Sequence, residues 1–599
     1  MEKIKYETNT YTYQELKDKV SLPKFQRGFV WSKSKQDGFI DTLKRGLPIG
    51  MFLLHKKENS DKFSIIDGRQ RMTTLKQFEE KAFEFFKEDN ISDEEAINFF
   101  DKDHDLANIY YQININGQKE YIKDYKQILY KEIYKKKISD SDSIKFNLVD
   151  ALMERFSNVK DKRYVRDHVT NYVNGLISLY DLSKLTVPVI EFYGSLDDVV
   201  ETFVNLNTMG TKLSKYDVFA AEWLEYEKNI NDKEILDEVY NKYKEASKKG
   251  IEVEGFDSES KKTEAKINIF EYAYAISKLL GKTCKKLVST SENADDIDTL
   301  AFTLLAGIFS IKNKDMKELG KLLYDSNIDL IDLKDKIIES TLKIESILEP
   351  YLISPTRDKS KFNALSELQI SSYIITWFKI NYSIIDDEII KQNVDRNKSK
   401  GFEAYLNKHM LYDLLRGFWA GSGDSKLDEL NENYFDSRYF HDISAENFRS
   451  SLDEWFEERK NKKSVSKEVK FVLHYIFRKT YQSDDYGLFD LDHIIPQANL
   501  AKLNIDAVDI NHPANLVYIS MFDNRKKRED TYYQLVNRNK TSMKLDEEEL
   551  ENYLYPRQDE IRFVESKESF TLERYNEFLA SRKEIIIKNF MKRLFNIQS

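Results

Sequence analysis

Four polar residues near the C-terminal end of the chain have the types and the order that hydrolysis of a phosphodiester bond requires. Asp492 and His493 are adjacent, and Asn515 and Asn524 follow them, nine positions apart. A histidine with an ordinary pKa of about 6.5 is largely unprotonated near neutral pH and can take a proton from water. The carboxylate of Asp492 and the amide of Asn524 offer hard oxygen ligands that suit Mg²⁺. The pattern therefore favours a metal-dependent nuclease.

The stretch that contains these residues, Leu488–Arg528, resembles the HNH (ββα-metal) endonuclease motif, in the form found at the C-terminal end of GmrSD-type modification-dependent restriction proteins. The resemblance implies a first strand that ends with Phe489–His493 and a second strand over Asn515–Ser520. It also implies a metal-binding helix that opens at Phe522. The C-terminal part is thus expected to fold as a ββα-metal nuclease domain.

The same resemblance implies a role for each of the four polar residues. His493 would be the general base, and Asn515 would orient it. Asp492 and Asn524 would be the metal ligands. Asn524 replaces the last histidine of the HNH motif, which leaves the number of metal ligands open. A strand end with a satisfied histidine is the alternative interpretation of the Asp-His pair.

Two neighbouring features each allow two interpretations. His512 could be a second imidazole near the phosphate or a turn residue before Pro513. The basic run that follows Asn524 could track the DNA backbone or form a solvated surface. Its members are Arg525, Lys526, Lys527 and Arg528. Because four residues of the stretch agree with the nuclease motif in type, order and spacing, we prefer the nuclease interpretation.

A second candidate site lies in the N-terminal part, where the pattern predicts a strand over Phe63–Asp67, a turn at Gly68 and a helix after it. Free N–H groups and the dipole at the start of such a helix attract phosphate. The surrounding side chains suit a nucleotide: arginines could fork onto phosphate oxygens, an acid could hold a metal or polarise a water, and glutamines would fix orientation. These residues are Arg27, Arg71, Asp67, Gln26 and Gln70. A tight turn with surface arginines is the alternative.

Three N-terminal segments resemble the ParB/sulfiredoxin-like domain that carries a DGQQR motif and forms the N-terminal half of GmrSD-type proteins. They are Gln26–Arg27, Pro48–Gly50 and Asp67–Leu75. Arg69 replaces the usual first glutamine of the motif and adds a charge. The resemblance implies nucleotide binding and hydrolysis, and a domain that senses modified DNA.

A later segment, Phe203–Trp223, resembles the part of the family that closes this domain, and it assigns Asn207 to the nucleotide pocket. The nucleotide-binding set that the resemblance implies is Gln26, Arg27, Asp67, Gly68, Arg69, Gln70, Arg71 and Asn207.

The composition indicates a soluble, helix-rich protein of several domains. At 599 residues the chain exceeds a single core and suggests roughly three or four domains. Glycine (19) and proline (8) are scarce and charged residues make up 33%, which favours long amphipathic helices. The single cysteine, Cys284, excludes an intrachain disulfide and a cysteine-based zinc cluster. The net charge of −10 is a weak guide to DNA binding, because the basic residues cluster.

We expect an α+β, mostly helical fold in three parts. Residues 1–225 would form the ParB/sulfiredoxin-like domain, residues 226–465 a helical spacer or sensor, and residues 466–599 the HNH domain with a C-terminal helix. The local patterns predict helices over Tyr11–Lys19, Asp37–Arg45 and Leu572–Phe595, strands over Leu47–Leu54 and Leu185–Phe192, a loop over Gly250–Lys262 and a helix–helix turn over Gly417–Lys426.

The two resemblances together predict a bacterial anti-phage endonuclease that depends on DNA modification and is regulated by a nucleotide. Its expected cofactors are Mg²⁺ or another divalent metal and a nucleoside triphosphate. Its expected partner is double-stranded, modified phage DNA. The sequence leaves open whether the protein forms a homo-oligomer. The opening residues lack an apolar signal segment, so we expect a cytoplasmic protein. The alternatives are a ParB-like DNA-binding protein that does not cut, an NTPase switch, and an unregulated nuclease toxin.

Overall fold

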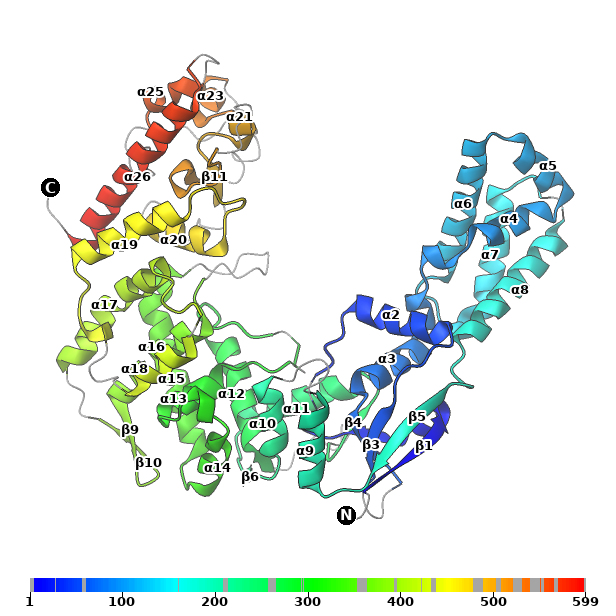
Figure 1. Ribbon diagram of the computed structural model, residues 1–599, viewed down its shortest axis with the longest axis horizontal. Helices are drawn as coiled ribbons and strands as arrows, with labels where there is room; N and C mark the ends of the chain where they lie inside the picture. Colours follow the sequence, from blue (N-terminus) through cyan, green and yellow to red (C-terminus); the bar gives the residue numbers. More distant parts are fainter. Residues whose placement is uncertain are drawn as a thin grey trace. The chain divides into compact units, whose positions relative to one another are not determined.

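A computed structural model describes most of the chain, and its elements are shown in Figure 1. The described residues are 5–26, 28–56, 61–159, 161–207, 214–256, 266–291, 293–294, 296–352, 364–392, 396–421, 423–432, 438–477, 489–501, 508–520, 530–538, 550, 554–564 and 569–596. The chain divides into two compact units. The first is Met1–Tyr272 with Ser291–Ile297, and the second is Ala273–Thr290 with Asp298–Ser599.

The first unit is built on a six-stranded mixed sheet. In spatial order its strands are β1 (Tyr6–Thr12), β5 (Thr186–Phe192), β3 (Phe52–Lys56), β4 (Phe63–Asp67), β2 (Val20–Leu22) and β7 (Glu252–Val253). The β1–β5 and β3–β4 pairs are antiparallel, and the β3–β5, β2–β4 and β2–β7 pairs are parallel. The central strands are rich in buried Phe, Leu and Ile, as strands covered by helices require.

Helices surround this sheet and extend the first unit. They are α1 (Tyr13–Leu16), α2 (Lys33–Lys44), α3 (Arg69–Glu80), α9 (Leu196–Asn207), α10 (Lys215–Glu222) and α11 (Lys233–Ser247), with a small sheet of β6 (Glu227–Asn229) and β8 (Lys266–Asn268). Three apolar side chains of α3 (Met72, Leu75 and Phe78) are fully buried, which fixes this helix directly after β4. The helix that carries the second half of the DGRQR segment is therefore rigidly placed.

Five helices between α3 and β5 form a bundle, and Figure 1 shows them side by side. They are α4 (Asp93–Asp101), α5 (His104–Gln112), α6 (Ile115–Ile133), α7 (Ser141–Arg155) and α8 (Lys162–Tyr180). Their core is aromatic: Phe99 contacts Tyr125 at a ring distance of 5.0 Å and Phe100 contacts Phe156 at 5.2 Å. Stacked and edge-on rings of this kind stabilise a bundle beyond the area they bury.

The second unit is a helix bundle. Its helices are α13 (Leu300–Ile308), α14 (Glu318–Asp325), α15 (Leu330–Leu348), α16 (Glu367–Asn381), α17 (Arg396–Leu415), α18 (Gly423–Glu432), α19 (Ala445–Glu458) and α20 (Lys467–Phe477); the unit boundary falls within α12 (Ile269–Thr283). A hairpin of β9 (Tyr382–Ile385) and β10 (Glu388–Lys391) follows α16. All side chains from Gln369 to Ile380 are buried, so α16 is the central helix of the bundle.

The C-terminal part of this unit combines a hairpin with short helices and one long helix. Its elements are β11 (Phe489–His493), α21 (Gln497–Ala501), η10 (Pro513–Asn515), β12 (Leu516–Ser520), α23 (Tyr532–Asn537), α25 (Gln558–Ile561), η11 (Arg562–Val564) and α26 (Leu572–Phe595). Helix α26 packs against α19 and η10. The remaining short 3₁₀ segments are η1 (Ala82–Phe85), η2 (Glu88–Asn90), η3 (Ile138–Asp140), η4 (Asn313–Asp315), η5 (Glu349–Tyr351) and η7 (Arg438–Phe440).

Several predicted elements are confirmed with their boundaries. The strand Phe63–Asp67 and the helix Leu572–Phe595 have the predicted limits, and strand β11 ends at His493, as predicted. The predicted strand over Leu185–Phe192 begins one residue later, at Thr186. Gly417–Lys426 spans the turn between α17 and α18 and the first residues of α18, as expected. The fold is mostly helical with a mixed sheet, which agrees with the expected α+β class.

Three local predictions are wrong. The expected helix over Tyr11–Lys19 is reduced to α1, because Tyr6–Thr12 pairs with β5 along its whole length. The expected strand Leu47–Leu54 begins only at Phe52, because Gly46 and Gly50 have φ values of 65° and 80° that break a ladder. The expected loop Gly250–Lys262 contains β7. In the described part of the chain, no helix is both long enough and apolar enough to cross a membrane.

Candidate functional site

The predicted nuclease residues Asp492 and His493 are the last two residues of β11. Strand β11 pairs antiparallel with β12, and in this register Asp492 lies opposite Val517 and His493 opposite Leu516. Val517 and Leu516 are almost completely buried, whereas Asp492 and His493 are partly exposed. The buried apolar residues of β12 therefore support the end of β11, where an acid and an imidazole are accessible to solvent.

The His493 imidazole is held by two amide side chains. Its Nε2 lies 3.0 Å from Oδ1 of Asn511 and 3.2 Å from the amide nitrogen of Gln497, the first residue of α21. Asn511 also donates from Nδ2 to the carbonyl oxygen of Lys462, at 3.0 Å. The contact with Asn511 was missed from the sequence, because 18 residues and a turn separate the two side chains.

Asn515 lies beside His493 in the fold, and its hydrogen bonds go to the backbone. Its side chain is fully buried, accepts from the N–H of Ile495 at 3.0 Å, and donates to the carbonyls of Ile495 and Ile510, both at 3.2 Å. Its own carbonyl accepts from the N–H of Ile494 at 2.8 Å. Asn515 thus joins the exit of β11 to the segment that leads into β12.

The other predicted residues of this site lie outside the described residues. They are Asn524, Arg525, Lys526, Lys527 and Arg528. Among the described residues no group of three or more His, Cys, Asp or Glu side chains could hold a metal ion. Asp492 by itself fits Mg²⁺, which takes one or two carboxylates and fills its remaining positions with water and substrate oxygens.

His512 has the environment of a structural residue. It is 2% exposed, and its Nδ1 accepts from the N–H of Ala514 at 3.1 Å, which caps η10. Burial, with a smaller contribution from the positive charge of Lys460, lowers the pKa of His512 to about 4. A neutral imidazole with this cap matches the interpretation as a turn residue before Pro513.

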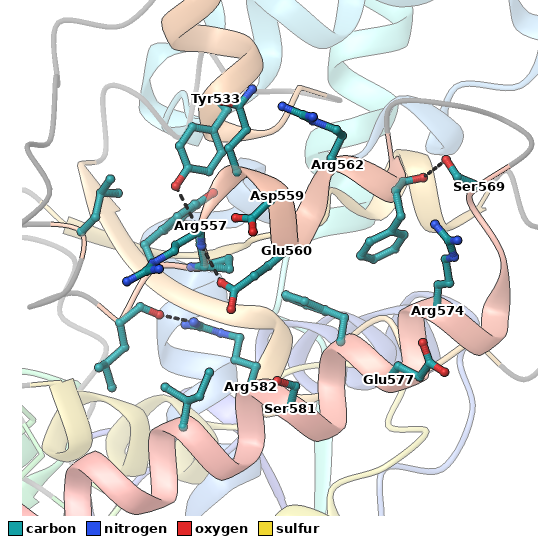
Figure 2. A pocket seen from close by; sticks show the side chains of 18 of the residues that line it. Tyr533, Arg557, Asp559, Glu560, Arg562, Ser569, Arg574, Glu577, Ser581 and Arg582 are labelled. Carbon is teal, nitrogen blue, oxygen red and sulfur yellow. Dashed lines mark hydrogen bonds between the residues drawn. The ribbon is translucent and has the colours of Figure 1, made fainter.

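A groove with a volume of about 1560 Å³ runs between α23, α25, η11 and the first half of α26 (Figure 2). Charged side chains of both signs line it, as Figure 2 shows: Arg557, Arg562, Arg574, Arg582, Asp559, Glu560 and Glu577. Tyr555 is a buried residue of its wall, and burial raises the pKa of Tyr555 well above its usual value, with a smaller contribution from the Asp492 carboxylate.

In the first unit, three polar residues of the DGRQR region turn inward. Gln26, Arg69 and Gln70 are 8%, 4% and 7% exposed. The Gln26 amide donates to the carbonyls of Ile65 and Ile66 at 2.7 and 2.8 Å, at the end of β4. The Arg69 guanidinium donates to the carbonyl of Gln26 at 3.1 Å. These side chains tie the segment before α2 to strand β4.

Gln70 completes this brace. Its Oε1 accepts from the N–H groups of Val30 and Trp31 at 2.9 and 3.2 Å, and its Nε2 donates to the carbonyl of Gly28 at 2.9 Å. Both ends of the amide are therefore used, and the segment from Gly28 to Trp31 is fixed against α3.

Asp67 is half exposed beside the start of α3, and Arg71 lies next to it with most of its side chain buried. They form an ion pair at 2.8 Å, with side-chain exposures of 47% and 16%. Arg71 also donates to the carbonyl of Ile49 at 3.0 Å and lies over the Phe52 ring at 4.6 Å. Burial lowers the pKa of the Arg71 guanidinium, and the charge of Asp67 opposes this shift. Of the predicted nucleotide-binding residues that the structure describes, Asp67 has the most exposed side chain.

Two glycines make this arrangement possible. Gly68 has φ 108°, and a Cβ there would lie 2.5 Å from the Phe52 ring. Gly50 has φ 80°, and a Cβ there would lie 2.6 Å from the Arg71 guanidinium. Gly68 is the N-cap of α3 and, having no side chain, provides no side-chain cap. Arg27 and the side chain of Asn207 lie outside the described residues.

Comparison with known proteins identifies the N-terminal part of the chain. Residues 10–224 match the family model of the GmrSD restriction endonuclease, N-terminal domain. This range contains the end of β1, strands β2 to β5 and the whole DGRQR region. No curated protein matches the chain.

The match defines the class of protein. The chain carries a domain of restriction endonucleases, which are nucleases that act in phage defence, and this class implies DNA as the partner. More closely, residues 10–224 match the N-terminal domain of GmrSD-type restriction proteins, which confirms the resemblance of Asp67–Leu75. The matched range ends at residue 224 and includes neither β11 nor β12.

Proposed function

We propose that the C-terminal part of this restriction protein is a metal-dependent HNH endonuclease that hydrolyses DNA phosphodiester bonds. The observation that carries the proposal is the end of β11, where Asp492 and a positioned His493 imidazole emerge side by side from a buried hairpin. A nuclease site needs a base and a metal ligand at one point of a rigid support, and this strand end supplies both.

In this mechanism His493 takes a proton from a water molecule, and the resulting hydroxide attacks phosphorus in line with the leaving oxygen. The bond from phosphorus to that oxygen breaks, and the oxygen is protonated as the product leaves. Bound Mg²⁺, held by Asp492 and Asn524, would supply positive charge to the phosphate oxygens. His493 has to keep its lone pair directed at the water, so its imidazole cannot rotate freely.

Asn515 acts on this geometry through the backbone. It holds the N–H and the carbonyl of Ile495, two residues after His493, and so it fixes the path of the chain that leaves β11. The role implied for Asn515 by the HNH resemblance, to orient His493, is thereby given a physical route.

We further propose that the N-terminal domain binds a nucleoside triphosphate and senses modified phage DNA, and that both control cleavage. Asp67 and Arg71 are the groups that would meet the phosphates, since Asp67 is half exposed beside Gly68 and Arg71 is paired with it. Gln26, Arg69 and Gln70 would support them by holding the adjacent segments in place.

A cleavage assay with several DNA substrates tests the proposal. Supercoiled plasmid, glucosylated phage DNA and phosphorothioated DNA are incubated with the full chain and Mg²⁺, with and without nucleoside triphosphate, and His493→Ala serves as the control. Cleavage of one modified substrate, altered by nucleotide and lost in the variant, is expected. Equal cleavage of all substrates would refute modification dependence. Nucleotide hydrolysis without any DNA product would favour the NTPase switch.

A further inference from the structure

The side-chain amide of Asn511 is held at both ends. Its Oδ1 lies 3.0 Å from Nε2 of His493, and its Nδ2 donates to the carbonyl oxygen of Lys462 at 3.0 Å. A backbone carbonyl can only accept a hydrogen bond, so the amide has to present its nitrogen to Lys462. The amide oxygen consequently faces His493, and the usual ambiguity between oxygen and nitrogen of an asparagine is resolved by the contacts.

This orientation determines where the His493 proton sits. An amide oxygen is an acceptor, so Nε2 of His493 has to carry the hydrogen. In the neutral imidazole the lone pair is then on Nδ1, because the two ring nitrogens exchange roles. The amide of Gln497, at 3.2 Å from the same Nε2, is compatible with this tautomer when its oxygen faces the ring.

We propose that Asn511 is the positioning residue of the nuclease site, which holds His493 in its Nε2–H tautomer so that Nδ1 accepts the proton from water. This inference rests on the proposed nuclease function and extends it to a residue outside the HNH motif. Asn511 does not touch the reacting atoms; it acts through His493. It has the place that a carboxylate or carbonyl has behind a catalytic histidine, with a neutral amide that adds no charge.

The anchor of Asn511 lies on the helix bundle. Lys462 belongs to the connection between α19 and α20, next to Asn461, which has φ 57°. This left-handed residue turns the chain sharply after α19. The base is therefore aligned from two sides: β11 fixes its backbone, and the α19–α20 connection fixes its ring through Asn511.

Asn511→Asp separates this role from a structural one. The substitution keeps the shape and an acceptor for Nε2–H, but it adds a negative charge beside the imidazole. A neighbouring opposite charge stabilises the protonated ring and raises the pKa of His493. Asn511→Ala removes the acceptor altogether. Asn447→Ala, an exposed asparagine on the first turn of α19, is the matched control.

Nitrogen-15 NMR of histidine-labelled full-length protein measures the tautomer and the pKa directly. The protein has 8 histidines, and the His493 signals are those that disappear in His493→Ala. We expect a neutral Nε2–H form in the wild type and a pKa that rises in Asn511→Asp. An Nδ1–H form in the wild type, or equal pKa values in the wild type and Asn511→Asp, would overturn the proposal.

Cleavage kinetics provide the second readout. Asn511→Ala is expected to lower kcat by about 10- to 100-fold with little change in KM. Asn511→Asp is expected to recover part of the rate and to move the acidic limb of the pH–rate profile upward, which a purely structural residue would not do. If the NMR results are as expected and the wild type cuts no DNA, the proposed function fails and the positioning role stands. If cleavage requires His493 while the profile of Asn511→Asp equals that of the wild type, the positioning role fails.

Discussion

Replacing Asn515 by alanine should loosen the hairpin that carries the candidate nuclease site. The Asn515 side chain is fully buried and forms three hydrogen bonds with the backbone of Ile495 and Ile510. With alanine at this position, the N–H of Ile495 and the carbonyls of Ile495 and Ile510 each lose a hydrogen-bond partner. Because water has poor access to this position, the backbone groups cannot simply exchange the lost bonds for hydration.

The size of the effect follows from these three bonds. A net contribution of roughly 1 kcal/mol for each hydrogen bond gives a loss of about 3 kcal/mol for the local stability of the hairpin. Since every 1.4 kcal/mol corresponds to a factor of ten, amide hydrogens of β11 and β12 should exchange about 100-fold faster when local opening limits exchange. The surface of the first unit should be unaffected.

Hydrogen–deuterium exchange with mass spectrometry measures this on the full chain. Peptides that cover β11 and β12 are compared in the wild type, in Asn515→Ala and in Asn447→Ala, in which an exposed side chain is removed from the same unit. Exchange in β12 that stays at the wild-type rate in Asn515→Ala would show that Asn515 does not hold the hairpin together. The reasoning about His493 and its support would then be wrong as well.

Three further changes test other parts of the molecule. Gln70→Leu keeps the side-chain volume but removes three hydrogen bonds to the segment from Gly28 to Trp31. Amide hydrogen exchange in that segment should therefore accelerate by a factor corresponding to about 3 kcal/mol. Unchanged exchange would show that Gln70 does not hold this segment against α3. Arg71→Ala should weaken nucleoside triphosphate binding by about 10- to 100-fold in calorimetry, because a charge-assisted hydrogen bond to phosphate is lost. The control variant Arg45→Ala, at the exposed end of α2, should bind the nucleotide with wild-type affinity. Equal affinities for the two variants would contradict a phosphate contact at Arg71. Burial lowers the pKa of His512 from 6.5 to about 4. Between these two pH values the unfolded chain binds a proton that the folded chain excludes. The free energy of unfolding therefore declines by up to about 3 kcal/mol as the pH falls from 6.5 towards 4. His512→Asn, which can still cap η10, should flatten this decline in acid-unfolding curves, and a slope equal to that of the wild type would argue against it.

The sequence predicted the elements that have a strong local pattern. The apolar stripe of Leu572–Phe595 and the short apolar run of β4 are readable because their patterns continue to the ends of the elements, whereas β11 was predicted from the resemblance to the HNH motif. Strand β1 was missed because its side chains are mostly exposed and polar; its pairing with β5, far away in the chain, decides its structure.

The candidate sites were predictable in residue type but not in contacts. Gln26 and Gln70 suit a ligand as well as a backbone brace, and only the fold shows that their amides meet the backbone around β4 and α3. The partner of His493 had no signal at all, because Asn511 reaches it through a turn and is itself anchored on a backbone carbonyl at Lys462. Any residue type can supply such a carbonyl, so no sequence pattern reports it.

The most direct test of the central proposal is the rate at which the purified full chain cuts its preferred DNA in Mg²⁺, measured in the wild type, in His493→Ala and in Asn447→Ala. Loss of a general base costs about 10²- to 10⁴-fold, so His493→Ala should cut at least 100-fold more slowly while it binds the same DNA with unchanged affinity. Chelation of the metal should stop the wild type, and Asn447→Ala should cut normally. Cleavage by His493→Ala at the wild-type rate would contradict a nuclease site at the end of β11.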